Sequence, residues 1–410
     1  MQRRTFLTAL TAGAAGVMPR LAQPPTPTAD CAHPILSLPV PSGRHPIGTT
    51  SIHLVDPSRT DPWVPAHPIR ELMIQLWYPA QHTSPHPTAR YIAPLAARHL
   101  AAAATARLGV SVPATAFSTL RTAARLAAPA AHPPRSGWPV LLFSPGDGLD
   151  RSSCTVLLQE LASHGFVTVG IDHTHDSGEV QFPDGRLEIR TLPPGSQDAA
   201  TLVRAADTRF VINQLERINT GINPDADGQA LPAGIDRALD LSRLGMFGHS
   251  HGGTSTAESM LQDPRIQAGA DLDGPVSDRV ATAGLNQAFL NLDSQIGGSA
   301  RAKFEHNLPL LWPRLTGWNL WLRLRDCGHL NFTDFGLFAG QLGAPQTATA
   351  GLLGTINPHR ALAITALYLH AYFSQTLERQ PQVLLERPSP DIPEMIFETL
   401  PRPTTARTRP

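Results

Sequence analysis

The decisive segment of the chain reads Leu244-Gly245-Met246-Phe247-Gly248-His249-Ser250-His251-Gly252-Gly253. Its apolar first half predicts a buried strand, and the residues after Gly252 are compatible with a helix. Between them, a serine flanked two positions away by glycines is typical of a nucleophile elbow, a sharp turn from strand to helix. Only small residues at those two positions let the strand and helix pass each other. The segment therefore predicts an α/β fold with Ser250 exposed at a helix N-terminus, where a developing anion is favoured.

Apolar runs alternate with helical patterns through the rest of the chain. Continuous apolar strands separated by amphipathic helices predict a mostly parallel central sheet with helices on both faces. The expected strands are 140–143, 166–171, 244–247, 268–272 and 320–324, and the expected helices are 152–163, 196–218, one from 252, and 358–373. Upstream, an alternating pattern predicts two antiparallel strands, at 49–55 and 69–78.

The domain boundaries follow from composition. Residues 31–387 are expected to form one α/β domain, and residues 388–410 a poorly ordered tail rich in Pro, Thr and Arg. Within the domain, residues 92–131 are rich in Ala, Leu and Arg with apolar residues at helical spacing. We interpret them as an inserted helical segment, which either covers a substrate cleft as a lid or extends the core.

Composition excludes several classes of protein. The 410 residues include 33 basic and 33 acidic side chains, so no bulk field favours nucleic acid or an anionic membrane surface as a partner. Cys31, Cys154 and Cys327 are too few for a disulfide framework. One bridge between Cys154 and Cys327 and two buried free thiols are the alternatives for the latter pair.

The N-terminus has the pattern of an export signal. Arg3-Arg4 precede Phe6-Leu7 and a weakly apolar stretch that ends at Met18-Pro19, which is typical of a twin-arginine (Tat) signal. A disordered tail is the alternative, and the stretch is too short to remain as a membrane anchor. Assigning residues 1–30 to a signal peptide and linker predicts a bacterial protein that is periplasmic or secreted.

A serine hydroxyl needs a base to remove its proton, and that base needs an orienting acid. In a fold of this kind the order along the chain is serine, acid, histidine, with the last two in loops after later strands. His329 fits the base because it follows the expected strand 320–324 in Asp326-Cys327-Gly328-His329. Other histidines precede this strand or lie in or beside a predicted helix, and are expected to be surface or core residues: His306, His359 and His370.

Three aspartates are candidates for the acid. Asp273 ends the expected strand 268–272 and is followed by Gly274-Pro275, which stops the strand. Asp271 is a close rival, because residues two positions apart on a strand face the same side. Asp293, later in the chain, is the third. Spacing alone does not separate them.

An oxyanion hole requires two backbone N–H groups. One would come from His251, the residue after Ser250. The other would come from the loop Ser144–Gly148 after the expected strand 140–143, where Asp147 is the candidate. A carboxylate is unfavourable beside a developing negative charge, so we expect the Asp147 side chain to point into solvent or to a cation such as Arg151.

The run Asp172-His173-Thr174-His175-Asp176 has the look of a metal-binding segment, with two histidines flanked by carboxylates. No third, distant ligand cluster can be identified from the sequence. A polar loop beside the active site explains these residues equally well, so we expect neither a metal nor a cofactor.

Several short motifs follow one another between residues 138 and 340, each occurring once. They are Phe143-Ser144-x-Gly146-x-Gly148 with Arg151, Leu161–Phe166, His173–Asp176, Gly248-His249-Ser250-x-Gly252-Gly253, Leu272-Asp273, and Gly328-His329-x-Asn331-Phe332-x-Asp334-Phe335. Together they resemble the platelet-activating factor acetylhydrolase family, the lipoprotein-associated phospholipase A2 branch of the α/β-hydrolases. The ordered set is far more specific than any one motif.

The resemblance implies an α/β-hydrolase fold and a role for each candidate residue. Ser250 would be the nucleophile, Asp273 the orienting acid in preference to Asp271, and His329 the base. The backbone of Asp147 and His251 would form the oxyanion hole. The chain departs from the family at the same two positions, since His251 replaces an aromatic residue and Asp147 a hydrophobic one. These changes affect the wall of the acyl pocket, and thus the phospholipid specificity, rather than the serine chemistry.

We therefore expect a serine hydrolase that cleaves carboxylic esters through an acyl-enzyme, without a cofactor. Short-acyl or oxidised lipid esters are the expected substrates, and peripheral contact with a lipid surface is left open. A polyester or cutinase-like hydrolase, a broad carboxylesterase and a peptidase are alternatives within the enzymes. An inactive hydrolase-fold binding protein is the alternative outside them. The oligomeric state cannot be read from the sequence.

Overall fold

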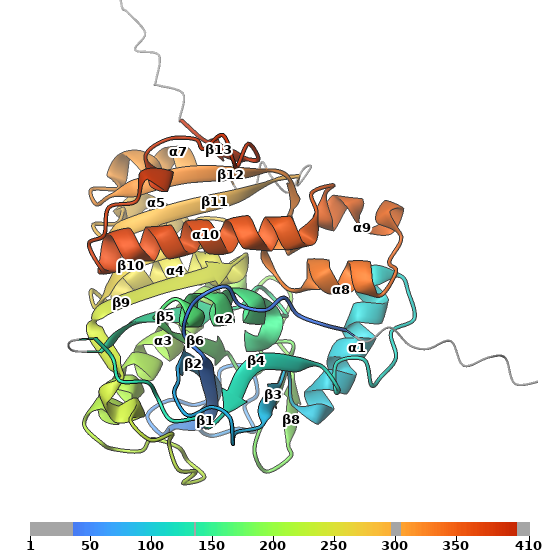
Figure 1. Ribbon diagram of the computed structural model, residues 1–410, viewed down its shortest axis with the longest axis vertical. Helices are drawn as coiled ribbons and strands as arrows, with labels where there is room; N and C mark the ends of the chain where they lie inside the picture. Colours follow the sequence, from blue (N-terminus) through green and yellow to red (C-terminus); the bar gives the residue numbers. More distant parts are fainter. Residues whose placement is uncertain (1–35, 135–136, 297–304, 400–410) are drawn as a thin grey trace, which may run out of the picture. The chain divides into compact units, whose positions relative to one another are not determined.

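The apolar runs form the middle of a large β-sheet (Figure 1). The computed structural model describes residues 36–134, 137–296 and 305–399. Neighbouring central strands pair in parallel, as predicted from their continuous apolar sequences. The parallel strands are β5 (Trp138–Ser144), β6 (Val167–Asp172), β9 (Leu239–His249), β10 (Ile266–Leu272), β11 (Ala288–Ile296) and β12 (Asn319–Gly328). The prediction did not include β11.

Eleven strands of the described chain follow one another in the order β13-β12-β11-β10-β9-β5-β6-β2-β1-β4-β3. The predicted upstream pair is present, as β1 (Ile47–Asp56) and β2 (Arg70–Pro79) run antiparallel with Ile52 opposite Ile74. β2 in turn pairs antiparallel with β6. A separate two-stranded hairpin consists of β7 (Glu179–Gln181) and β8 (Leu187–Ile189).

Helices cover both faces of the sheet, and alternate strand residues serve the two cores. Leu142 of β5 belongs to one core, whereas its neighbours Leu141 and Phe143 belong to the other. The first core contains side chains of α3 (Gln197–Asn219), α4 (His251–Gln262), α5 (Asp278–Ala283) and α7 (Leu308–Leu311). The second contains side chains of α2 (Thr155–Ser163) and α10 (Pro358–Leu377).

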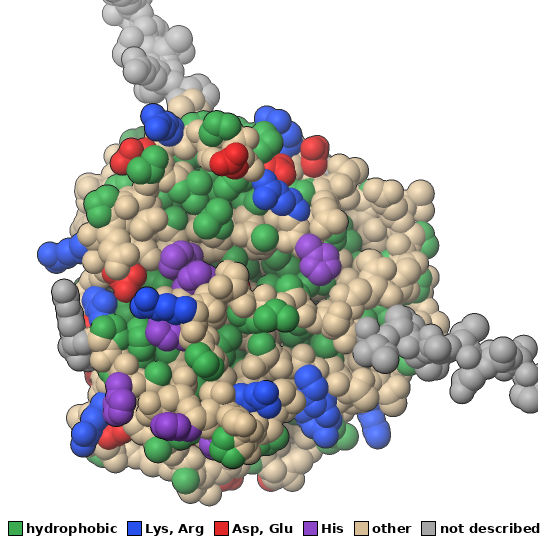
Figure 2. All heavy atoms as spheres, viewed as in Figure 1, with side chains coloured by type: hydrophobic (Ala, Val, Ile, Leu, Met, Phe, Trp, Pro, Cys, Tyr) green, Lys and Arg blue, Asp and Glu red, His purple; other side chains and the backbone are tan. Residues whose placement is uncertain are grey.

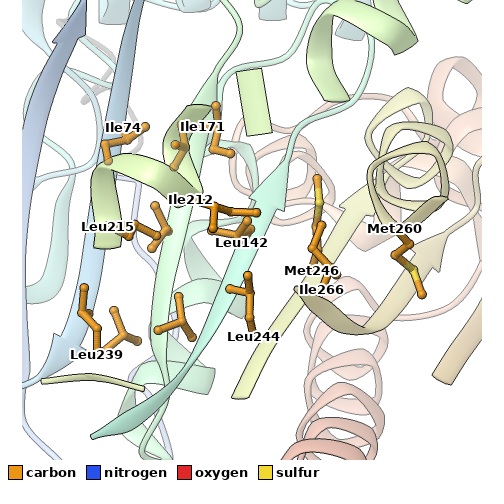
Figure 3. Close-up of a cluster of buried hydrophobic side chains, with 14 of the residues drawn as sticks. Ile74, Leu142, Ile171, Ile212, Leu215, Leu239, Leu244, Met246, Met260 and Ile266 are labelled. Atoms are coloured by element: carbon orange, nitrogen blue, oxygen red, sulfur yellow. The ribbon is translucent and has the colours of Figure 1, made fainter. Parts of the chain in front are cut away.

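Figure 3 shows part of the first core, where Ile212 and Leu215 of α3 lie over Leu142 and Ile171 of the strands. All four side chains are fully buried. Burial of each such side chain stabilises the fold by roughly 1.5–3 kcal/mol. This packing fixes the strand ends from which the candidate site residues project.

The segment 92–131 differs from its prediction. It is helical only over α1 (Pro94–Leu108), which ends at Gly109 in the left-handed conformation. Residues Arg121–Leu126 instead form strand β4, between β1 and β3 (Thr88–Arg90). The strand pattern is visible in the burial, since Thr122 and Ala124 are buried and their neighbours are more exposed. The apolar residues that suggested a second helix therefore belong to a strand that lies next to the edge strand β3.

The C-terminal part also differs from its prediction. Residues 388–399 are described, and within them β13 (Met395–Phe397) pairs antiparallel with β12. The proposed signal and linker at 1–30 and the last residues, 400–410, lie outside the described residues. None of the helices in the described ranges combines the length and apolarity needed to cross a membrane.

On the face shown in Figure 2, acidic and basic side chains are mixed.

The remaining elements are short. They are α8 (Phe335–Gln341), α9 (Gln346–Leu353) and the 3-10 helices η1 (Arg151–Cys154), η2 (Ile235–Arg237), η3 (Trp312–Arg314), η4 (His329–Phe332) and η5 (Val383–Leu385). Among them, α8 packs with α1 in a third apolar cluster.

Candidate active site

Ser250 lies at the turn between β9 and α4, in a conformation that few non-glycine residues adopt. Its φ is 56° and its ψ is −123°. The turn is held by Ser250 N–H, which donates to Leu272 O at 2.9 Å. A Cβ atom on Gly248 would lie 2.2 Å from Gly252, and one on Gly252 would lie 1.9 Å from Ser144 O. The close approach of strand, turn and helix therefore requires glycine at both positions, as the motif predicted.

The side chain of Ser250 lines a cavity of about 840 Å³. A volume of this size is within the range of small-molecule sites. Its lining is mixed, with apolar and polar side chains of both charges: Asp147, Gln197, Asp198, Thr201, Leu202, His251, Thr254, Glu258, Pro275, Val276, Ser277, Asp278, Arg279, His306 and Asn307. His306, which the sequence suggested to be a surface or core residue, is one of these.

Asp273 and His329 are hydrogen-bonded to each other. His329 Nδ1 lies 2.7 Å from Asp273 Oδ2, and Ser294 donates to the two carboxylate oxygens through its N–H and its hydroxyl, each at 2.7 Å. Although burial alone would raise it, the pKa of Asp273 is lowered, chiefly by the hydrogen bond with His329. Asp273 is buried, while 23% of the His329 side chain is exposed. A buried carboxylate thus orients a partly accessible imidazole.

The chain turns at Asp273-Gly274, after β10, and this turn lies against the backbone of Ser250. Asp273 has a φ of 60°, and a Cβ atom on the next residue, Gly274, would lie 2.2 Å from Ser250 O. Asp271, the close rival, instead accepts from Gly274 N–H at 2.8 Å and lies against Gly253 of α4. Burial raises the pKa of Asp271 well above its usual value, which makes it a poor partner for a charged imidazole. Asp293, the third candidate, accepts from Trp321 Nε1 at 2.6 Å.

His249 is a site residue that the sequence reasoning did not single out. Its ring centroid lies 4.5 Å from that of His329, and its Nε2 is 2.9 Å from His329 O. Burial, together with the charge of His329, lowers the pKa of His249 to about 3. A neutral His249 can donate to that carbonyl and hold the backbone of His329 without adding a charge. Its place beside Ser250 in the decisive segment was the available signal.

The two proposed oxyanion residues line the same cavity as the serine. His251 is the first residue of α4, where an amide N–H has no acceptor inside the helix. Its side chain is buried against Thr201, with Nε2 2.8 Å from the hydroxyl. Burial and the nearby Arg204 lower the pKa of His251 to about 3. The imidazole is thus a neutral part of the wall.

The Asp147 carboxylate has a cationic partner, but not the one suggested by the sequence. It accepts from Arg190 Nη2 at 2.7 Å. Arg151 instead binds Asp172, through both its backbone N–H and its guanidinium. The sequence placed Arg151 close in the chain, but the segment carrying Arg190 folds back over the loop. The negative charge of Asp147 is therefore offset at the cavity mouth.

Arg204 supports the loop that carries Asp147, and the sequence reasoning missed it. The side chain is fully buried on α3 and donates to Pro145 O. Its Nε and Nη2 bind the two oxygens of Asp176, each at 2.7 Å. An arginine at a buried position of α3, one turn before the buried Asp207, was the available signal. Through Arg204, the run at 172–176 is tied to the candidate oxyanion loop.

A second serine, histidine and aspartate also lie in hydrogen-bonding order. Ser144 Oγ is 3.0 Å from His173 Nε2, and His173 Nδ1 is 3.0 Å from Asp207 Oδ2. All three side chains are fully buried. Asp207 is further bound by Arg70, which lowers the pKa of the carboxyl although burial alone would raise it. These residues belong to a buried polar network.

The remaining sequence candidates have structural settings. Cys154 and Cys327 are buried free thiols, so the bridge considered between them is absent. Burial raises the pKa of both thiols well above the usual value, which makes them unreactive. His370 packs on His164, with ring centroids 4.4 Å apart. His359 is exposed at the start of α10.

Comparisons with known proteins find similarity to ester hydrolases. The model of a family described as platelet-activating factor acetylhydrolase, isoform II, matches residues 33–183. This match includes the loop of Asp147 and ends before Ser250. The chain is also similar to a solved ferulic acid esterase from Streptomyces cinnamoneus, at 34% identity and a TM-score of 0.74, over 89% of this chain and 100% of that one.

Two curated relatives have related names. A probable 1-alkyl-2-acetylglycerophosphocholine esterase from Arthroderma benhamiae is 28% identical over 65% of this chain and 67% of its own length. A platelet-activating factor acetylhydrolase from Gallus gallus is 24% identical over 57% of this chain and 61% of its own length. The chain therefore spans about two thirds of the length of these relatives.

Proposed function

The chain belongs to the platelet-activating factor acetylhydrolase family of α/β-hydrolases and is a carboxylic ester hydrolase; on that premise we propose that Ser250, His329 and Asp273 are its catalytic residues. The observation that carries the proposal is the buried Asp273 carboxylate bound to His329 Nδ1, next to a serine held at φ 56° on the wall of a cavity. This arrangement has the roles that serine hydrolysis needs.

In the proposed reaction, His329 takes the proton of the Ser250 hydroxyl as its oxygen attacks the ester carbonyl. Asp273 keeps the proton on Nδ1 of His329 and stabilises the imidazolium that forms. The backbone N–H groups of Asp147 and His251 donate to the oxyanion of the tetrahedral intermediate. His329 returns its proton to the leaving alcohol, and then activates the water that hydrolyses the acyl-enzyme.

Short-acyl esters of lipids are the proposed substrates. The relatives named for 1-alkyl-2-acetylglycerophosphocholine and platelet-activating factor support this class. A phosphocholine group carries both signs of charge, and the cavity has carboxylates at Asp198 and Asp278 together with the cation Arg279. Charges of both signs at the cavity can attract the two ends of such a headgroup.

Aromatic acyl esters are a second candidate class, and one observation favours them. The solved structure that resembles nearly the whole chain is named a ferulic acid esterase. The cavity volume of about 840 Å³ is large for an acetyl group and can receive an aromatic acid with its alcohol. His251 and Val276 would supply part of the wall beside such a ring.

Export is a separate part of the proposal. The paired arginines at 3 and 4, followed by a weakly apolar stretch, support a Tat signal within residues 1–30. Substitution of both arginines by lysine should retain the protein in the cytoplasm of a bacterial host. Unchanged recovery from the periplasm or medium would contradict a twin-arginine route.

One assay tests the activity and separates the substrate classes. The chain is assayed with p-nitrophenyl esters from acetate to palmitate, with methyl ferulate, and with 1-alkyl-2-acetylglycerophosphocholine, using Ser250→Ala as the control. We expect Ser250-dependent turnover that is highest for short acyl chains. A preference for methyl ferulate would select the aromatic class, and a palmitate optimum would contradict both. Activity that survives Ser250→Ala would contradict the proposed nucleophile.

A further inference from the structure

A cluster of histidine and carboxylate side chains lies on loops outside the Ser250 cavity. From the sequence, His175 lacked partners for a metal site. The structure brings two to it, His67 from the β1–β2 loop and Glu188 from strand β8. One ligand atom from each of the three residues lies within 4.8 Å of the other two. None of the three is among the residues that line the cavity at Ser250.

The distances are those of a site that can close on one ion. His175 Nε2 is 3.1 Å from Glu188 Oε2, and His67 Nε2 is 3.9 Å from Glu188 Oε1. Tetrahedral zinc, with bonds of about 2.0–2.2 Å, keeps its ligand atoms roughly 3.4 Å apart. The observed separations, each to a different oxygen of Glu188, lie on either side of that value. Arg186 approaches Glu188 at 3.4 Å, but its shorter contact, at 2.8 Å, is to Glu71.

A buried carboxylate orients the central ligand. His175 Nδ1 lies 2.9 Å from Asp61 Oδ2, which fixes the ring and leaves Nε2 toward His67 and Glu188. Asp61 is itself held by Arg70, at 2.7 Å, and by the backbone N–H groups of Trp63 and Val64. Metal-bound histidines generally have such a carboxylate on the other nitrogen. The site therefore has an outer layer of support as well as three ligands.

Access and competing charge also favour this cluster. The His175 side chain is 2% exposed, but that of His67 is 31% exposed, which leaves a solvent path on one side. A second group, formed by Asp147, Asp176 and His251, satisfies the same distance limit. Its two carboxylates are already bound by arginines, as described above. A cation there would have to displace both guanidinium groups.

We propose that His67 Nε2, His175 Nε2 and a Glu188 carboxylate oxygen bind one Zn²⁺ ion, with water as the fourth ligand. Two imidazoles and one carboxylate suit zinc better than calcium, which takes mainly oxygen ligands. The ion would join the β1–β2 loop, the loop after β6 and the β7–β8 hairpin. His175 O also accepts from Thr191 and Leu192 N–H, so the site is connected to the segment leading to α3. This proposal does not depend on the ester hydrolase activity.

The experiment uses the full chain without a polyhistidine tag, stripped of metal with a chelator and then titrated with Zn²⁺. Calorimetry gives the stoichiometry and Kd, and a thermal scan gives Tm with and without zinc. We expect one ion per chain, and a Tm increase of about 3–5 °C at a free zinc concentration a hundred times Kd. Ca²⁺ at the same concentration should produce neither effect.

The variants His67→Ala and Glu188→Gln should each weaken zinc binding more than about 100-fold, since even outer partners of metal ligands contribute 10–100-fold. Both side chains are partly exposed, so the variants should fold. His359→Ala is the matched control, because this exposed histidine lies outside the cluster and should leave the binding unchanged. The proposal would be overturned if the chain failed to bind one Zn²⁺ ion at tens of micromolar free zinc. It would also be overturned if His67→Ala and the wild type bound zinc with equal affinity.

Discussion

Two sets of serine, histidine and aspartate lie in the molecule, with their serines at the ends of the neighbouring strands β5 and β9, and they differ in access and backbone geometry. In both, the histidine Nδ1 is hydrogen-bonded to a buried aspartate, at 2.7 Å for His329 and 3.0 Å for His173. Ser144 of the second set is even bonded to its histidine, at 3.0 Å. Hydrogen-bond order alone therefore does not select Ser250 over Ser144.

Access and chemistry of the surroundings separate the two sets. Ser250 lines the cavity and has a left-handed backbone at the start of a helix, whereas Ser144 ends strand β5 and is fully buried. Arg204 also donates to Ser144 Oγ, at 3.3 Å. A hydroxyl that is fully buried cannot reach a substrate, and the positive charge of the guanidinium disfavours its use as a nucleophile. The comparison suggests that one set is built for reaction and the other for stability.

The largest expected difference concerns the two serines. Ser250→Ala should lower kcat by about 10⁶-fold, and His329→Ala by a similar factor, because the triad residues act as a unit. Ser144→Ala should lower kcat less than about 10-fold and reduce the free energy of unfolding by about 1–3 kcal/mol, since it leaves buried partners unsatisfied. Steady-state kinetics and urea unfolding of the three variants test this. A fluorophosphonate adduct on Ser144 instead of Ser250 would reverse the assignment.

The two aspartates sharpen the comparison. Asp273→Asn should lower kcat about 10⁴-fold with little change in stability, because His329 would then be held in the wrong tautomer. Asp207→Asn should leave Arg70 incompletely paired in the interior, and we expect it to destabilise the fold by about 3–5 kcal/mol. Kinetics below the unfolding temperature and thermal scans measure both effects. Equal loss of activity in the two soluble, folded variants would remove the distinction between the sets.

Acid should act on the network around the buried set. Burial alone would raise the pKa of both Asp61 and Asp176. Hydrogen bonds and charges from His175 and Arg70 nevertheless lower the pKa of Asp61 to about 2, and Arg204 lowers that of Asp176 to about 2. Because both values lie below the unfolded value of about 3.9, each carboxylate contributes about 2 kcal/mol that is present above pH 4 and is lost as the pH falls toward 2. Urea unfolding between pH 6 and pH 2 measures the loss. A flat profile across that range would contradict it.

The smallest effect is expected where the two sets meet. Arg204 is a positioning residue, since it holds the loop of Asp147 through Pro145 O. Arg204→Met should reduce kcat by about 10–100-fold with little change in KM, as a displacement of about 1 Å near the reacting atoms can do. Arg190→Ala, which removes the partner of the exposed Asp147 carboxylate, is the control. Its kcat should stay within about 10-fold of the wild-type value. A change confined to KM would show that Arg204 affects substrate binding rather than the oxyanion loop.

Local patterns predicted the central part of the molecule well. The parallel sheet, the helices on both faces and the position of Ser250 between β9 and α4 follow from short segments with strong periodicity. The choice between Asp271 and Asp273 did not follow from the residues, because it depends on which carboxylate the loop after β12 reaches. Spacing along one strand contains no information about that loop. The resemblance to a known family supplied the preference.

Features that depend on distant segments were missed or misread. The cationic partner of Asp147 is Arg190 and not Arg151, which the sequence had suggested. The second half of the predicted helical insertion contains strand β4. His67 and Glu188 could not be associated with His175 from the sequence. His67 lies more than a hundred residues earlier, in the loop before β2, and Glu188 lies on the later β7–β8 hairpin. For Asp147 the nearest cation in the chain was preferred, whereas the fold brings a remote one closer.

The two described edges of the sheet have a consequence for the behaviour of the protein at high concentration. The outermost strands, β3 and β13, have three residues each. A neighbouring molecule that added a strand at either edge could form few main-chain hydrogen bonds, and short edges are a known defence against such pairing. The width of the sheet therefore does not by itself make it a template on which further copies add strands.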